Sequence, residues 1–483
     1  MDDILYGQAL DLCPPSHLKR EASLEWLGYA LYIRFERYGD PDDLQKAVAF
    51  QRQALDLRFL LHPRRPKSLS DLARSLATRF ARYGKLDDLL EALRLHRAAL
   101  ELHPPGHPFR SSSLSNLANS VRTRFEQLGK LEDLEEATGL YREALELRPP
   151  GHVGRASSLN SLANSVQIRF NQLSKLEDLE EAAVLHREAL ELCPPGHPLR
   201  CSRLNNLASV VQTRFQRLGK LDDLEEGVTL HRAALELCPP GHPLRSSSLN
   251  NLANMVRIRF QQLGRLEDLE EAVVLHREAL ELSPPGHPLR SYSLHGLASV
   301  VLARFHQLSR LEDLKESVIL HREALALSPP GYPLRSSSLN SVANTVITRF
   351  KRLGRLEDLE EATVLHREAL ELRPPGHPKR EITLNNLGNV VRTRFERLGK
   401  FEDLEEATAL HREALELRPP GHPNRSISLN NLGNAVRTRF ERLGKLEDLE
   451  QATVLHREAL ELCPPGHPKR SITLNNLAIV AQI

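Results

Sequence analysis

Apolar side chains recur with helical spacing along almost the whole chain. In the segment 111–128 the apolar positions include Leu114, Leu117, Val121 and Phe125. Offsets of three, seven and eleven residues from the first place these side chains on one face of an α-helix. The pattern predicts an amphipathic helix whose apolar stripe packs against another element.

A second helical stripe follows after a short break. The segment 131–147 again carries apolar residues at helical spacing, and Gly129 stands before it as a natural left-handed helix end. Asp133, with Glu136 three residues later, is typical of a capping pair at a helix start. The proline pair that begins at Pro149 ends the second helix, because proline cannot donate to the helix ladder. The two segments therefore predict a helix hairpin.

The hairpin repeats with a period of 45 residues. The motif Pro-Pro-Gly-His, or Pro-Pro-Gly-Tyr once, recurs with no insertion or deletion. Its glycines are Gly106, Gly151, Gly196, Gly241, Gly286, Gly331, Gly376, Gly421 and Gly466. A single hairpin cannot bury its own stripe, so the units must stack. We predict an all-α, right-handed α-solenoid: a half repeat at 1–15, ten repeats at 16–465 and a truncated half repeat at 466–483.

Particular residues within the unit resemble the tetratricopeptide repeat (TPR). They are Leu114, Leu117, Ala118, Val121, Ala137, Tyr141, Ala144 and Pro149. The longer motifs at 411–417, 421–423 and 428–433 resemble kinesin light chain repeats, and those at 394–399 and 402–407 resemble fungal TPR proteins whose arrays often precede a CHAT domain. The resemblance implies a scaffold whose first helices line a groove for peptides or partner domains. The chain contains no CHAT-like segment, so no protease activity carries over.

Composition narrows the partners. The 65 basic and 63 acidic residues nearly cancel, which argues against a general affinity for nucleic acid or anionic membranes. Four of the five cysteines stand at one repeated position, where they are interpreted as small fillers rather than as a disulfide framework. An apolar run long enough to span a membrane and a signal peptide are both lacking. We expect a cytoplasmic protein.

Catalytic and metal-binding patterns are not evident. The sequence has no phosphate-binding loop, dinucleotide-binding turn, Cys-x-x-Cys or His-Glu-x-x-His motif. We therefore expect no enzyme activity, no cofactor and no metal site. Most of the 21 histidines fall into two ladders, one in the loops and one on the second helices. Ladders separate equivalent rings by about 10 Å, so structural roles are favoured over shared metal ligation.

A recurring ion pair is predicted between the two helices of each unit. An arginine precedes the phenylalanine of every unit and an aspartate follows it nine residues later, as in Arg124 and Asp133. The favoured interpretation is a pair that fixes hairpin geometry, with the aspartate also capping the second helix. The alternative is a ladder of arginines that binds phosphates or acidic peptides.

Asparagines give the candidate binding groove. By analogy with TPR arrays, the groove displays residues one, five and eight positions after the leading leucine of each first helix. An amide can both donate to and accept from a peptide backbone, and arginine beside it can hold a carboxylate. The candidates are Asn119, Asn164, Asn254, Asn344, Asn389 and Asn434 with Arg122, Arg257, Arg392 and Arg437. Those at the first position, such as Asn385 and Asn430, serve equally well as partners that align neighbouring units.

Two further expectations concern the middle and the end of the array. Leu302 and Ile347 replace arginine in two successive units and could form an apolar pocket flanked by charge. The last segment, 474–483, carries an apolar stripe without a polar cap. A piece of a longer protein, a truncated gene model and end-to-end self-association all fit this end. The rival functions are the regulatory arm of a larger enzyme, such as a CHAT-type protease, and a structural spacer.

Overall fold

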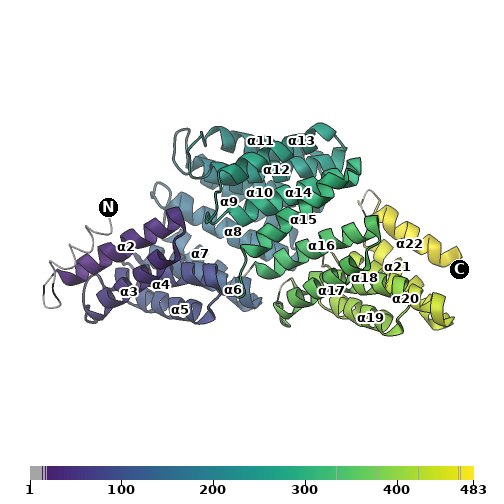
Figure 1. The fold of residues 1–483 in the computed structure, drawn as a ribbon. Helices are drawn as coiled ribbons and strands as arrows, with labels where there is room; N and C mark the ends of the chain where they lie inside the picture. Colours follow the sequence, from purple (N-terminus) through teal and green to yellow (C-terminus); the bar gives the residue numbers. More distant parts are fainter. Residues whose placement is uncertain are drawn as a thin grey trace.

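The protein is an array of paired antiparallel helices (Figure 1). The computed structural model describes residues 14, 17, 19–332, 334–377, 379–422, 424–465, 467 and 469–482. The first helices of the units are α2 (Arg20–Tyr38), α4 (Arg65–Tyr83), α6 (Arg110–Leu128), α8 (Arg155–Leu173), α10 (Arg200–Leu218), α12 (Arg245–Leu263), α14 (Arg290–Leu308), α16 (Arg335–Leu353), α18 (Arg380–Leu398), α20 (Arg425–Leu443) and α22 (Arg470–Gln482). The second helices are α3 (Pro41–Asp56), α5 (Leu86–Glu101), α7 (Leu131–Glu146), α9 (Leu176–Glu191), α11 (Leu221–Glu236), α13 (Leu266–Glu281), α15 (Leu311–Ala326), α17 (Leu356–Glu371), α19 (Phe401–Glu416) and α21 (Leu446–Glu461).

The pairs stack side by side into a superhelix. Each first helix packs on its own second helix and on the second helix of the preceding unit. In Figure 1 the second helices α11 and α13 lie on the outer edge of the array, and the first helices α10, α12 and α14 lie towards its interior. The predicted all-α solenoid is therefore confirmed. The half helix expected before residue 13 lies outside the described residues.

The local stop signals act as the sequence indicates, but the start signal does not. Gly129 ends α6 with φ 72°, and Ser174 takes the same left-handed conformation at the end of α8. The second helix α7 begins at Leu131, and its N-cap, Lys130, makes no side-chain capping bond. Asp133 thus lies inside the first turn. The capping pair predicted from Asp133 and Glu136 is wrong, because this aspartate is committed to an arginine.

That arginine–aspartate pair is confirmed in all ten units. In α12, the Nε of Arg259 donates to both oxygens of the Asp268 carboxylate and Nη2 donates to one of them, and the Asp268 side chain is 5% exposed. The equivalent Arg124 binds Asp133 with N–O distances of 2.8 and 2.9 Å. Such forked pairing fixes both side chains. The pair ties the end of each first helix to the start of its own second helix and so sets the hairpin geometry.

A buried amide–imidazole network joins five of the described units to the unit that follows each of them. The Asn250 side chain, fully buried on α12, lies 2.8 Å from Nδ1 of His276 on the paired helix α13. Its amide nitrogen donates to Ser293 of the following unit. The same arrangement recurs at Asn205, Asn340, Asn385 and Asn430. These asparagines align neighbouring units, which resolves the alternative left open for the first groove position.

The cysteines correct a second expectation. Cys193 and Cys463 are buried free thiols, as small core fillers would be. Cys201, at the start of α10, and Cys238, just after α11, instead form a disulfide, with Cα atoms 7.0 Å apart. Recurrence could not reveal this pair, because Cys201 stands at a position that serine or another residue takes in the other units. One hairpin is thus covalently closed.

Successive turns of the superhelix touch at glycines. A Cβ atom on Gly39 would lie 2.8 Å from the carbonyl oxygen of Gly286, and a Cβ on Gly84 would overlap the carbonyl of Gly331. Both pairs are separated by 247 residues (286 minus 39, and 331 minus 84). The short connection between the two helices of one pair therefore contacts the loop that joins two units one superhelical turn later. We call this contact line the seam.

Candidate binding surface and inter-turn cavity

The candidate asparagines divide by what their side chains contact. Asn119 accepts a hydrogen bond from the Tyr141 hydroxyl, and Asn254 donates to the Tyr292 hydroxyl over 3.2 Å. The other members of the set show no side-chain hydrogen bond within the described part of the chain. They are Asn164, Asn344, Asn389 and Asn434. All six are exposed or half-buried, so their amides remain accessible to a ligand.

The four candidate arginines are not equivalent. Arg122, Arg392 and Arg437 each pair with a glutamate four residues later on the same helix: Glu126, Glu396 and Glu441. Burial alone would lower the pKa of Arg122, but Glu126 and Tyr141 outweigh it and the pKa is raised. These three guanidiniums are thus already neutralised.

Arg257 has no such partner. Residue 261 is Gln261, and no carboxylate of the described residues lies within ion-pair distance of the Arg257 guanidinium. Its Nε is buried without a hydrogen-bond partner. Burial lowers the pKa of Arg257, and Tyr292 partly offsets this. The guanidinium remains charged, because arginine does not lose its proton in proteins.

The apolar positions and the tyrosine complete this part of the surface. Leu302 on α14 and Ile347 on α16 are half-buried at the register that Arg257 takes on α12. Ile347 packs against the core around Val346 and Phe350. Sequence reasoning missed Tyr292 as a site residue. The available signal was that tyrosine replaces the serine found at the equivalent positions 112, 157, 247 and 337.

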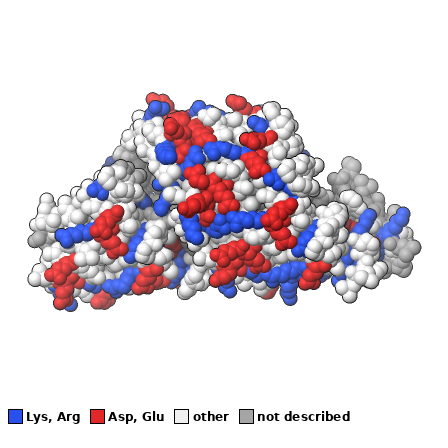
Figure 2. Space-filling view, turned by 180° about the vertical axis from the view of Figure 1, so that it is seen from behind, with Lys and Arg blue, Asp and Glu red and all other residues white. Residues whose placement is uncertain are grey.

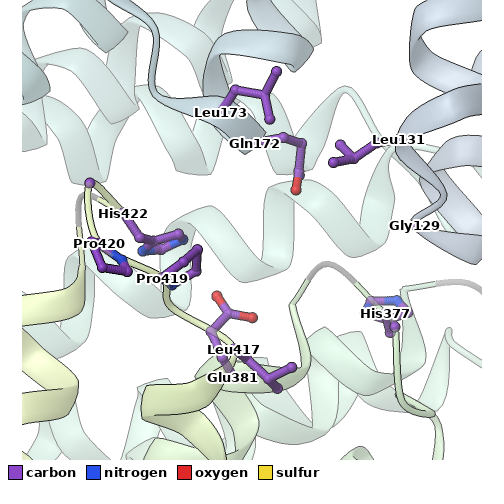
Figure 3. A pocket seen from close by; sticks show the side chains of 12 residues that line it. Gly129, Leu131, Gln172, Leu173, His377, Glu381, Leu417, Pro419, Pro420 and His422 are labelled. Atoms are coloured by element: carbon purple, nitrogen blue, oxygen red, sulfur yellow. The ribbon is translucent and has the colours of Figure 1, made fainter.

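A separate cavity lies where the seam opens. Its volume is about 330 Å³, and it lies between residues 129–173 of one superhelical turn and 376–422 of the next (Figure 3). Leu131 and Leu173 face Pro419 and His422 across it, and the Glu381 carboxylate points into the space. A Cβ on Gly129 would meet nothing within 4 Å, unlike one on Gly39 or Gly84. The two turns have separated at this point.

The charged groups of the cavity are shifted toward their neutral forms. Burial raises the pKa of Glu381, although Arg418 and Arg373 oppose the shift. Burial also lowers the pKa of His377 to about 4 and that of His422 to about 4. None of these residues was a candidate from the sequence, since the two turns that form the cavity are hundreds of residues apart.

The histidines follow the structural interpretation. In the loops the ring accepts from a backbone amide two residues later, as His107 does from Phe109. On the second helices the rings are buried, and burial lowers the pKa of His276 to about 3. Within the described residues, no three His, Cys, Asp or Glu side chains are grouped to hold a metal ion. None of the described helices combines the length and apolarity needed to cross a bilayer.

The outer face shows no single-sign patch. Second helices of neighbouring units are linked by arginine–glutamate pairs, such as Arg277 with Glu316 and Arg322 with Glu361. Figure 2 shows acidic and basic side chains alternating across the face seen there. Exposed pairs of this kind contribute little stability.

Stacked helix pairs of this kind define a helical repeat scaffold. A tetratricopeptide repeat model matches residues 67–109, 155–199, 200–244, 245–289, 382–424 and 427–469, more than half of the chain. The chain therefore belongs to the tetratricopeptide repeat family, an architecture typical of protein binding. No protein of curated function matches it in sequence.

Three solved structures are similar to the chain at low sequence identity and to different extents. The human IFIT1 dimer with PPP-AAAA is 15% identical, with a TM-score of 0.55 over 99% of this chain and 92% of that chain. A Podospora anserina putative kinesin light chain with nearly identical TPR-like repeats is 20% identical, with a TM-score of 0.35 over 45% of this chain and 98% of that one. Yeast Tom70 is 15% identical, with a TM-score of 0.37 over 96% of both chains.

Proposed function

We propose that this protein is a scaffold that binds a peptide or partner domain along the inner face of its first helices, without catalysis of its own. The observation that supports this most is a contrast within the first helices α16, α18 and α20. Asn385 is committed to the packing between units, whereas Asn389, four residues later on the same helix, has an uncommitted side-chain amide. Solenoids use such extended inner surfaces for binding.

Variation along the same surface gives the second support. Eight residues after the leading leucine, successive units carry arginine, glutamine, glutamine, arginine, leucine, isoleucine, arginine and arginine. Residues that only fix the geometry of a unit recur, as the arginine–aspartate pairs do. A surface that changes from unit to unit can select one partner orientation and register.

The test is selection of ligands from a displayed random-peptide library with the full chain. A variant with Asn389, Asn434, Arg392 and Arg437 changed to alanine should lose captured peptides, with its circular dichroism spectrum unchanged. The control variant, Arg277→Ala with Arg322→Ala, alters only exposed pairs on the outer face and should retain them. Retention by both variants, or selection of no peptide, would contradict the proposal and favour the spacer.

A regulatory arm of a larger enzyme, such as a CHAT-type protease, is the alternative function. It predicts that the same groove binds a ligand and that ligand binding changes the activity of an attached domain.

Two further predictions belong to the proposed function: the protein is cytoplasmic, and it self-associates through α22. Fluorescence microscopy of the tagged chain and concentration-dependent light scattering test them.

A further inference from the structure

Arg257 is a positive charge without an ion-pair partner among the described residues, and the neighbouring units carry neutral side chains at the same register. The equivalent positions on the two preceding units are Gln167 and Gln212, and those on the two following units are Leu302 and Ile347. The Nε of Arg257 is buried without an acceptor, as are those of Arg392 and Arg437, but the latter two guanidiniums each pair with a glutamate and Arg257 pairs with no carboxylate of the described residues. A ligand carboxylate at the terminal nitrogens of Arg257 therefore forms charge-assisted bonds without displacing a protein carboxylate.

Two neutral donors stand beside this charge. The Asn254 amide donates to the Tyr292 hydroxyl, which leaves the hydroxyl hydrogen available to an acceptor. Burial raises the pKa of Tyr292, against the effects of Asn254 and Arg257, so the phenol stays protonated. A guanidinium and a phenol hydroxyl together offer donors to an oxyanion and no competing carboxylate.

Apolar side chains follow at a defined spacing. Neighbouring first helices pack at about 10 Å, so Leu302 lies about that far from Arg257 along the surface and Ile347 about as far again. An extended peptide advances about 3.3 Å per residue. A chain crossing α12, α14 and α16 therefore meets the charge, the leucine and the isoleucine about three residues apart.

We propose that the inner face of α12, α14 and α16 binds an extended peptide with one acidic side chain followed, in steps of three residues, by two large apolar side chains. The carboxylate accepts from Arg257 and the Tyr292 hydroxyl, and the apolar side chains cover Leu302 and Ile347. This inference rests on the proposed function and names the ligand class for one part of the groove.

The experiment measures fluorescence anisotropy of labelled peptides with the full chain. One probe carries the pattern Asp-Ser-Gly-Leu-Ser-Gly-Leu, in both chain directions, and its partner replaces aspartate with asparagine. We expect the aspartate peptide to bind about tenfold or more tightly, because charge-assisted bonds to a desolvated arginine are the stronger kind. Equal binding of the two probes would overturn the inference.

Matched variants locate the effect. Arg257→Gln, which copies the glutamine of the preceding unit, should abolish the aspartate preference. Arg277→Gln should leave it intact, because Arg277 lies on the outer face and pairs with Glu316. Tyr292→Phe should reduce the preference several-fold. Loss of the preference in the Arg277→Gln variant to the same extent would contradict the assignment.

Other anions are further outcomes. If inorganic phosphate, or an oligonucleotide with a 5′-triphosphate, displaces the probe through Arg257 more effectively than the acidic peptide does, the peptide class is wrong. If library selection yields peptides that depend on Asn389 and Asn434 but not on Arg257, the inference fails and the proposed function stands. If no peptide is selected at all, the proposed function itself fails.

Discussion

Contacts between neighbouring units and contacts between superhelical turns are built on different principles. Neighbouring units share a buried network, such as His411 with Asn385 and Ser428, that recurs along the chain. The turns meet at glycines, as where Gly84 leaves its backbone bare against Gly331. Neighbouring units are therefore joined by hydrogen bonds between side chains, whereas superhelical turns approach each other closely because glycine has no side chain.

The difference shows how local and global shape are encoded. Every recurring residue acts within about one unit, and the small rotation per unit accumulates into the superhelix. The turns then meet wherever that rotation brings them. The seam is closed at Gly39 and Gly84 and open at Gly129, although all three glycines have the same left-handed conformation. The same local sequence therefore has different surroundings one superhelical turn apart.

Acidification should have the largest effect, because it acts on many units at once. The buried rings have folded pKa values of about 3 at His411 and His321 and about 4 at His366, against 6.5 for an ordinary histidine. Below pH 6.5 the unfolded chain binds protons that the folded chain does not, so stability is full above pH 6.5 and falls as the pH decreases. We expect a loss of roughly 1 kcal/mol per buried ring by about pH 5.5.

One unit supplies an internal control for this loss. Tyr141 stands in the ring position of α7 and does not titrate in this range, because burial raises its pKa above 10.0. Protection factors from hydrogen exchange at pH 7.5 and 5.5 should fall more for α18 and α19 than for α6 and α7. A uniform fall, or a melting temperature that stays level over this range, would contradict the account.

Removal of one hairpin ion pair should come next in size. Arg259→Ala leaves the Asp268 carboxylate buried without its cation, which costs about 3 kcal/mol for a well-buried pair. The matched control is Arg277→Ala. Its pair with Glu316 has side chains 51% and 35% exposed, so we expect less than about 1 kcal/mol. Urea unfolding of both variants measures the difference, and equal losses would refute the distinction between buried and exposed pairs.

The seam should change shape more than stability. Gly84→Ala and Gly354→Ala both force alanine into a left-handed conformation, with φ of 73° and 71°, and carry a similar penalty of about 1 kcal/mol. Only the first places a methyl group against the next turn, since a Cβ on Gly354 would meet nothing within 4 Å. Small-angle X-ray scattering should show a longer maximum dimension for Gly84→Ala alone. An unchanged profile would mean that the seam does not hold the turns together.

Much of the fold was predictable because the determinants are local and repeated. Helix stripes, the glycine stop at Gly129 and the fixed spacing of Arg124 and Asp133 all act within a few turns of chain. The ion pair between Arg124 and Asp133 was predicted correctly, and that same pair explains why the helix cap predicted at Asp133 was wrong. One carboxylate cannot face the arginine and also cap the helix, and the charged partner is the stronger one.

For the candidate surface, the accessibility of the side chains was predictable from the helical register, but their contacts were not. Helical register places Asn389 and Arg257 on the inner face, yet an amide fits both packing and ligand contact, so the role of Asn385 required coordinates. The isolation of Arg257 could have been predicted from Gln261, since a glutamate four residues later is the usual neutraliser on a helix. The inter-turn cavity could not be predicted from the sequence, because its position depends on the rotation between neighbouring units, summed over several units.

The seam also has a mechanical consequence. Its partners are unlike elements, the turn within a helix pair on one side and the loop between pairs on the other, so the contact has a direction and does not close into a ring. The backbones of Gly84 and Gly331 are already in contact, so the two superhelical turns cannot move closer together there. Bare backbone provides few interactions that would oppose moving the turns apart. The array should therefore resist compression along its axis from the start and lengthen under a modest pull before any helix pair unfolds.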